Sequence, residues 1–202
     1  MSRISFVLAP LAIILLAAAI FFVVSDSPRT RACDELPGSV QRDWDALELD
    51  LEFPKRLEVA KSVLHDATLR SIYGVWSAIG LENAAFIFTS RDGDKGPILF
   101  VEEKRSSVLE ARLVSEGLPN YENAPLNLAA LQTGPSTVAS LVETQFQDVD
   151  ALTMTLLVES CELRWHVKGR ISDATGKPSV DFDGSVTDGA HVFEIGTVRE
   201  LD

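Results

Sequence analysis

The chain is poor in cysteine and lacks the short motifs that carry common catalytic and cofactor chemistry. Its 202 residues include two cysteines, Cys33 and Cys161, and neither belongs to a CxxC pair. This argues against thioredoxin-like redox chemistry and against a zinc clip. There is no GxSxG or SxxK nucleophile motif, no Walker-type phosphate loop and no GxGxxG fingerprint. We therefore expect no catalytic, cofactor-binding or metal-ligating residues and no cofactor, although a carboxylate pair assembled by folding is invisible in a sequence.

Positive charge is also scarce. Lys and Arg together number 18 and Asp and Glu 30, which gives a formal net charge of −12. A nucleic-acid surface needs clustered cations to neutralise phosphates, and a polybasic grip on anionic lipid needs them too. The charge balance therefore argues against nucleic acid as a partner and against a polybasic membrane patch.

One long hydrophobic run is present, at residues 4–24, and it contains no charge. As an α-helix it would be roughly 31 Å long, close to the ~30 Å hydrocarbon core of a bilayer. We predict that residues 1–24 form a retained transmembrane signal anchor in contact with membrane lipid. The alternative is a cleaved signal peptide with Val23 and Ser25 at the cleavage site, but the run is longer than the usual apolar region of about 7–15 residues. Lipidation of Cys33 is not expected, because polar residues separate it from the run.

The expected orientation follows from the flanks of this run. Arg3 precedes it, while Arg29 and Arg31 follow it among acidic residues, so the local charge bias is small. A very short N-terminal tail is typical of a signal anchor whose remaining chain is exported. We expect a single-pass protein of the inner membrane with its C-terminal domain on the periplasmic side.

The rest of the chain predicts a linker at residues 25–42 and one α+β domain at residues 43–202. We expect a mainly antiparallel sheet with a C-terminal β-meander and two to four helices. Strict alternation of Leu and Phe with Glu and Asp predicts a strand at residues 47–53. The remaining elements expected in the first half are a helix at 54–72, a hairpin of 84–89 with 98–102, a helix from a Ser107/Glu110 capping box to Gly117, and a helix from Ser136 to about Phe146.

The C-terminal quarter predicts strands at 153–159, 162–171, 180–186 and 192–201, with Asp188-Gly189 as a two-residue hairpin turn. The second of these strands has a basic polar face, whereas strands 47–53 and 180–186 have acidic ones. Opposite charges on neighbouring strands are stabilising. We therefore predict that the basic strand pairs with one or both acidic strands.

Few individual residues are singled out. If the domain is exported, Cys33 and Cys161 are expected to form a disulfide that closes a loop of more than 100 residues and contributes roughly 4–5 kcal/mol. Trp44, at the domain edge, and His166, on the polar face of its strand, are candidate exposed interaction residues. His166 with His191 is a weaker alternative as a metal or acid–base pair. Trp165 lies on the apolar phase of its strand and is expected in the core.

These observations favour a non-catalytic accessory or assembly protein that presents an acidic domain outside the membrane and acts by protein–protein interaction. Its partner would be another membrane or periplasmic protein. Two alternatives remain open. One is a membrane-anchored extracytoplasmic hydrolase whose site is assembled from distant residues. The other is a ligand-binding sensor that works through a partner protein.

Overall fold

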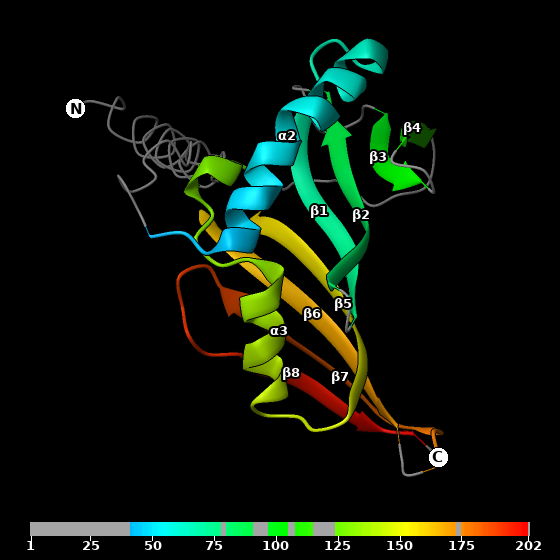
Figure 1. Cartoon of the computed structure of the whole chain (residues 1–202), viewed down its shortest axis with the longest axis vertical. Helices are drawn as coiled ribbons and strands as arrows, with labels where there is room; N and C mark the ends of the chain where they lie inside the picture. Colours follow the sequence, from blue (N-terminus) through cyan, green and yellow to red (C-terminus); the bar gives the residue numbers. More distant parts are fainter. Residues whose placement is uncertain are drawn as a thin grey trace, which may run out of the picture. The chain divides into compact units, whose positions relative to one another are not determined.

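In the part of the chain that the structure describes, eight strands form one antiparallel sheet, and two α-helices pack on one of its faces (Figure 1). The computed structural model describes residues 41–77, 80–90, 97–104, 108–114, 124–172 and 175–201. Among them, no helix has both the length and the apolar character needed to span a bilayer. The predicted anchor at 4–24 lies outside these ranges. In chain order the elements are α2 (Trp44–Val63), β1 (Thr68–Ser77), β2 (Gly80–Thr89), β3 (Ile98–Lys104), β4 (Val108–Val114), the 3₁₀ turn η1 (Leu128–Ala130), α3 (Pro135–Glu143), β5 (Val149–Glu159), β6 (Glu162–Ser172), β7 (Pro178–Thr187) and β8 (Glu194–Glu200).

The sheet consists of two similar halves. In each half a helix is followed by four strands that pair in sequence order, and the strand order across the sheet is β4-β3-β2-β1-β5-β6-β7-β8. The halves meet where β1 and β5 run antiparallel, with Ile72 opposite Leu156 and Trp76 opposite Leu152. The prediction of an α+β domain with a mainly antiparallel sheet is therefore confirmed. So are the hairpin of β2 with β3 and the C-terminal meander of β5 to β8.

The strand predicted at residues 47–53 is wrong, because this segment lies inside α2. The Asp43 side chain caps the helix by accepting a hydrogen bond from the Ala46 amide at 2.8 Å. Of the alternating apolar side chains, Leu49 is buried but Leu51 is 63% exposed. Burial instead follows a helical period, and Arg56 is among the buried residues. Leu and Glu both favour helices, so the alternation was a poor guide here.

Two further helix predictions need correction. The helix predicted at 54–72 ends at Val63, and residues 68–77 form strand β1. The capping box at Ser107 and Glu110 does not start a helix, since Val108–Val114 is strand β4, which pairs along its whole length with β3. Cross-strand pairing outweighs the local cap signal here. The last helix is present as α3, with Gly134 rather than Ser136 at its N-cap.

The Asp188-Gly189 turn is also longer than predicted, because β8 begins only at Glu194. The residues between β7 and β8 form a loop that buries Phe193, which is 2% exposed. The Asp188 carboxylate turns inward and accepts hydrogen bonds from the amides of Gln132 and Thr133.

The core lies between the helices and the sheet. Trp165 is fully buried, as predicted, and its indole Nε1 donates a hydrogen bond to the Thr133 carbonyl at 2.8 Å. Where the segment after α3 meets β7 and the loop before β8, the core is aromatic. Phe146 stacks on Phe182 with ring centroids 4.1 Å apart, and Phe193 meets both rings edge-on. Phe182 of β7 thus packs on the helix side of the sheet.

Candidate functional site

The sheet face of β5 to β8 that points away from the helices carries a ladder of charged side chains. Along β6, Leu163, Trp165 and Val167 are buried, so the alternating polar residues occupy the opposite face. Strand β7 pairs with β6 so that Arg170 lies opposite Asp181 and Lys168 lies opposite Asp183. The predicted pairing of the basic strand with the acidic strand 180–186 is thus confirmed. Pairing with residues 47–53 is not found, because those residues are helical.

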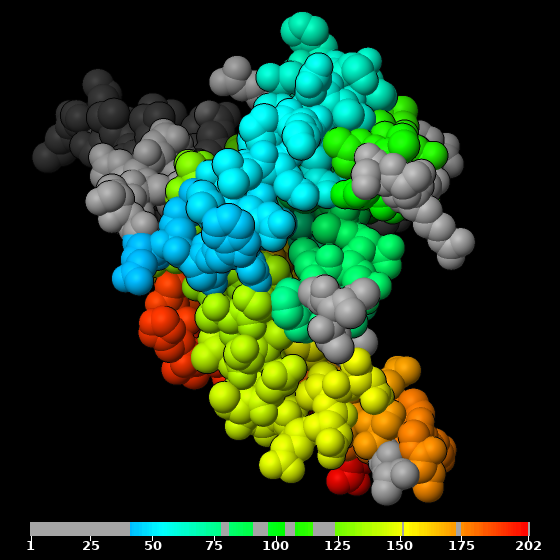
Figure 2. Space-filling model, in the orientation of Figure 1, coloured from blue at the N-terminus to red at the C-terminus, as the bar shows by residue number. Residues whose placement is uncertain are grey.

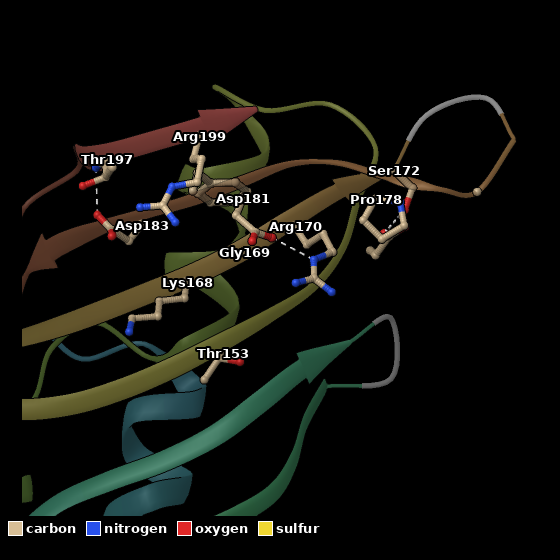
Figure 3. Close-up of a pocket in the computed structure, with 13 residues that line it drawn as sticks. Thr153, Lys168, Gly169, Arg170, Ser172, Pro178, Asp181, Asp183, Thr197 and Arg199 are labelled. Carbon is tan, nitrogen blue, oxygen red and sulfur yellow. Dashed lines mark hydrogen bonds and ion pairs between the residues drawn. The ribbon is translucent and has the colours of Figure 1, made fainter. Parts of the chain in front are cut away.

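An open groove of about 830 Å³ runs across this face (Figure 3). Side chains from all four strands line it, including Thr153 on β5, Lys168 and Arg170 on β6, Asp181 and Asp183 on β7, and Thr197 and Arg199 on β8. The groove brings together residues that are up to about fifty positions apart in the chain. Its lining combines three cations and three carboxylates with apolar surface, so it suits an extended segment with charged side chains better than an apolar small molecule.

Some of these charges are already paired. Arg170 Nε lies 2.7 Å from Asp181 Oδ1, and this hydrogen bond lowers the pKa of Asp181 and raises that of Arg170. Asp183 Oδ1 accepts a hydrogen bond from the Thr197 amide at 2.8 Å. This contact sits at a register shift in β8, where a Cβ on Gly196 would lie 2.5 Å from the same oxygen. Glycine at 196 therefore lets Asp183 hold the bulge in β8.

Two cations in the groove have no such partner. Lys168 is exposed, and no hydrogen bond or ion pair reaches its ammonium group within the described ranges. Figure 3 shows it extending away from the Arg170–Asp181 pair. Arg199 acts on Asp181 through space and helps to lower its pKa. The groove thus presents two positive side chains whose charge is not neutralised by a direct contact.

The ladder continues beyond the groove toward the β5–β6 turn, where the cations are paired. Arg164 lies between Glu159 and Glu194, with closest distances of 3.7 Å and 3.4 Å. His166 Nε2 lies 3.4 Å from Glu159 Oε2. These contacts form a surface ion-pair network rather than an arrangement of a nucleophile and a base. Within the residues that the structure describes, no three His, Cys, Asp or Glu side chains form a metal-binding group.

The residues singled out from the sequence are dispersed. His166 lies next to the groove, whereas Trp44 begins α2 on the helix side of the sheet and is 70% exposed. His191 is exposed in the loop before β8. Cys161 is exposed in the β5–β6 turn, and its partner in the predicted disulfide, Cys33, lies outside the described ranges. Their roles as interaction residues remain predictions.

The sequence did not point to Arg199 or Thr197 as site residues. Both lie on β8, where the bulge opposite Asp183 shifts the side chains by one position relative to strict alternation. In the sequence, Arg199 follows Asp181 by eighteen positions, and in the structure the two residues face each other across β7 and β8. This pairing can be predicted only when the length of the loop between β7 and β8 is known.

Comparison with known proteins assigns no family. No protein-family model matches the chain, and no curated protein matches it. One solved structure that is similar is the crystal structure of a "putative lipoprotein" from Clostridium difficile 630. It shares 11% sequence identity and a TM-score of 0.43, and the match covers 74% of this chain and 92% of that chain. Similarity at this level carries no argument about function.

Proposed function

We propose that this protein is a membrane-anchored, non-catalytic accessory protein that holds a partner through the groove on the outer face of β5 to β8. The observation that carries the proposal is the pair of cations, Lys168 and Arg199, which make no direct ion pair with any described residue, in an open groove whose lining also holds three carboxylates, Asp150, Asp181 and Asp183. A partner that presents carboxylates in an extended segment would complement this groove. The carboxylates of the groove, Asp150 and Asp183, would keep the partner's acidic groups at Lys168 and Arg199 and so fix their positions.

The groove provides specificity more than affinity. Exposed ion pairs each contribute about 0.2–1 kcal/mol, so two such pairs cannot hold a partner alone. Most of the binding energy would come from contact with the neighbouring strand surface. The charges would set the register of the partner and suppress binding of basic or apolar segments.

The proposed location is the outer face of the inner membrane, with residues 4–24 as the anchor. Support comes from the length and uncharged composition of that segment. A disulfide between Cys33 and Cys161 fits an exported domain. The state of Cys161 supports this disulfide. Cys161 is the one cysteine within the described residues, and it is not a free thiol. Cys33 is the one other cysteine in the sequence.

The proposal is tested by extracting the full chain from its own membrane in mild detergent and measuring its native size, with mass spectrometry of comigrating proteins. We expect stoichiometric comigration with a larger complex. The double variant Lys168→Glu/Arg199→Glu should lose the complex while keeping its circular dichroism spectrum. Arg112→Glu, which reverses an exposed charge on β4 in the other half of the sheet, is the matched control and should keep it. A lone 22.0 kDa species, or a complex that survives the double variant, would contradict the proposal.

A further inference from the structure

The outward side of α2 carries an apolar stripe that packs against none of the described core. Trp44 and Leu51 are 70% and 63% exposed, and Leu47 and Pro54 are partly or fully exposed between and beyond them. Positions 44, 47, 51 and 54 follow the spacing of three and four residues that places side chains on one helix face. Figure 2 shows α2, in blue and cyan, at the surface on this side of the molecule. We call Trp44, Leu47, Leu51 and Pro54 the α2 stripe.

The stripe is separate from the face that folds the domain. Ala46, Leu49 and Ala60 are buried on the opposite side of α2, and they belong to the hydrophobic core. Packing in the core therefore explains why one face of α2 is apolar, but it does not explain the apolar side chains of the α2 stripe. Contiguous exposed apolar side chains of this kind mark an interaction surface.

The charges around the stripe are balanced even though the chain is strongly acidic. Glu48 and Glu58 are exposed on this side of α2, and so are Lys55 and Lys61. The other acids nearby are occupied. For example, Asp50 pairs with Arg42 at 2.9 Å. The exposed charges on the stripe side of α2 therefore offset one another, although residues 42–61 as a whole carry six acids and four bases.

The position of the stripe in the chain indicates what lies against it. Trp44 follows the end of the apolar segment at Val24 by twenty residues. As a random coil, a tether of twenty residues has a root-mean-square span of about 25 Å, which would keep the stripe close to the bilayer at a high effective concentration. Tryptophan and leucine on one face of a helix are also typical of segments that lie in the membrane interface.

We propose that the first half of α2 lies in the interface of the bilayer that holds the anchor, with Trp44, Leu47 and Leu51 toward the lipid. This inference rests on the proposed anchor at residues 4–24. A partner protein is a weaker occupant, because a stable interface buries about 800 Å² on each side and four side chains supply only part of that. Contact with lipid would fix the sheet's orientation and present the groove on its other face.

The test uses the full chain reconstituted in vesicles of phosphatidylcholine and phosphatidylglycerol with brominated acyl chains. Bromine quenches a tryptophan only at close range. We expect quenching in the wild type and its loss in Trp44→Phe, which leaves Trp76 and the buried Trp165 in place. Leu51→Glu should also lose the quenching. Val198→Glu is the matched control, since Val198 is 51% exposed on β8, and should retain it.

Flotation of the vesicles on a density gradient separates the two proposals. Protein that floats and shows quenching through Trp44 supports both. Protein that floats without quenching, or whose quenching is unchanged in Leu51→Glu, overturns the docking of α2 while the anchor stands. Protein that does not float overturns the anchor and the docking together.

Discussion

Replacing Asp188 tests how the loop between β7 and β8 is held to the segment before α3. Asp188 Oδ1 accepts hydrogen bonds from the Gln132 amide at 3.0 Å and the Thr133 amide at 2.8 Å. Thr133 is 5% exposed, and its carbonyl accepts the Trp165 indole hydrogen bond. The carboxylate therefore joins the α3 segment to the meander next to the largest buried side chain of the core.

The expected magnitude follows from the donors left behind. In Asp188→Ala the Thr133 amide is buried without a partner, and the partly exposed Gln132 amide can turn to water. An unpaired buried donor costs about 1–3 kcal/mol, so the variant should lose about that much unfolding free energy. Asp188→Asn can keep both hydrogen bonds through one oxygen and should lose about 1 kcal/mol, the typical net worth of one hydrogen bond.

The pH dependence has a definite sign. Burial raises the pKa of Asp188 above its ordinary value of 3.8, although the amides of Thr133 and Gln132 act in the opposite direction. Because the folded pKa is raised, this group's contribution to stability is fully present below the unfolded pKa and is lost as pH rises through the folded pKa. The stability of the wild type relative to Asp188→Asn should therefore fall as pH rises from below 3.8.

The assay is urea unfolding of the full chain in mild detergent, followed by tryptophan fluorescence at several pH values. Trp165 is a local probe, because its indole is bonded to Thr133. Equal losses in the Ala and Asn variants would show that the two backbone hydrogen bonds are not what Asp188 contributes. A relative stability of the wild type that grows with pH would refute the burial argument.

Three other perturbations have expected outcomes. Gly169→Ala should lower the unfolding free energy by about 1–3 kcal/mol in the same assay, because a Cβ there would lie 2.1 Å from the Phe182 ring. An unchanged unfolding free energy would mean that the ring moves aside at no cost. Arg56→Ala should cost about 1.5–3 kcal/mol, the worth of a hydrogen bond to a charged group, since the buried guanidinium bonds Glu52 at 2.8 Å and the freed Glu52, 42% exposed, can be hydrated; a loss below about 1 kcal/mol would contradict a structural role. Reducing a Cys33–Cys161 disulfide should slow migration of the chain on a gel without reductant and lower its unfolding free energy by about 4–5 kcal/mol. If Cys161→Ser changed neither the migration nor the unfolding free energy, the bond would be excluded.

The sequence predicted the second half of the fold better than the first. In β6 the alternation of Trp165 and its apolar neighbours with charged residues is reliable, because the segment contains β-branched and aromatic residues and is bounded by turns. The segment 47–53 alternates just as strictly but contains Leu and Glu, which favour helices. Its helical state depends on the Asp43 cap and on burial of Arg56, and neither of these is visible in a local pattern.

The candidate site was predictable only in part. The pairing of Arg170 with Asp181 follows from the charges of two strands that adjoin in sequence. The contribution of Arg199 depends on the bulge held by Asp183 and on a loop that is longer than two residues. Both are consequences of tertiary contacts, since the loop is shaped by burial of Phe193 and by the inward turn of Asp188. Local sequence patterns do not contain this information.

The two-half architecture has a consequence for assembly. Of the strand pairs in the described sheet, only β1–β5 joins strands that are not consecutive in the chain. Each half can form its own hairpins from local contacts, which favours rapid folding, and a cut between β4 and η1 would leave every other strand pair intact. The proposed disulfide would then have a second role. Cys33 precedes the first half and Cys161 lies within the second, so the bond would add a covalent link to the β1–β5 pairing and the shared core that join the halves.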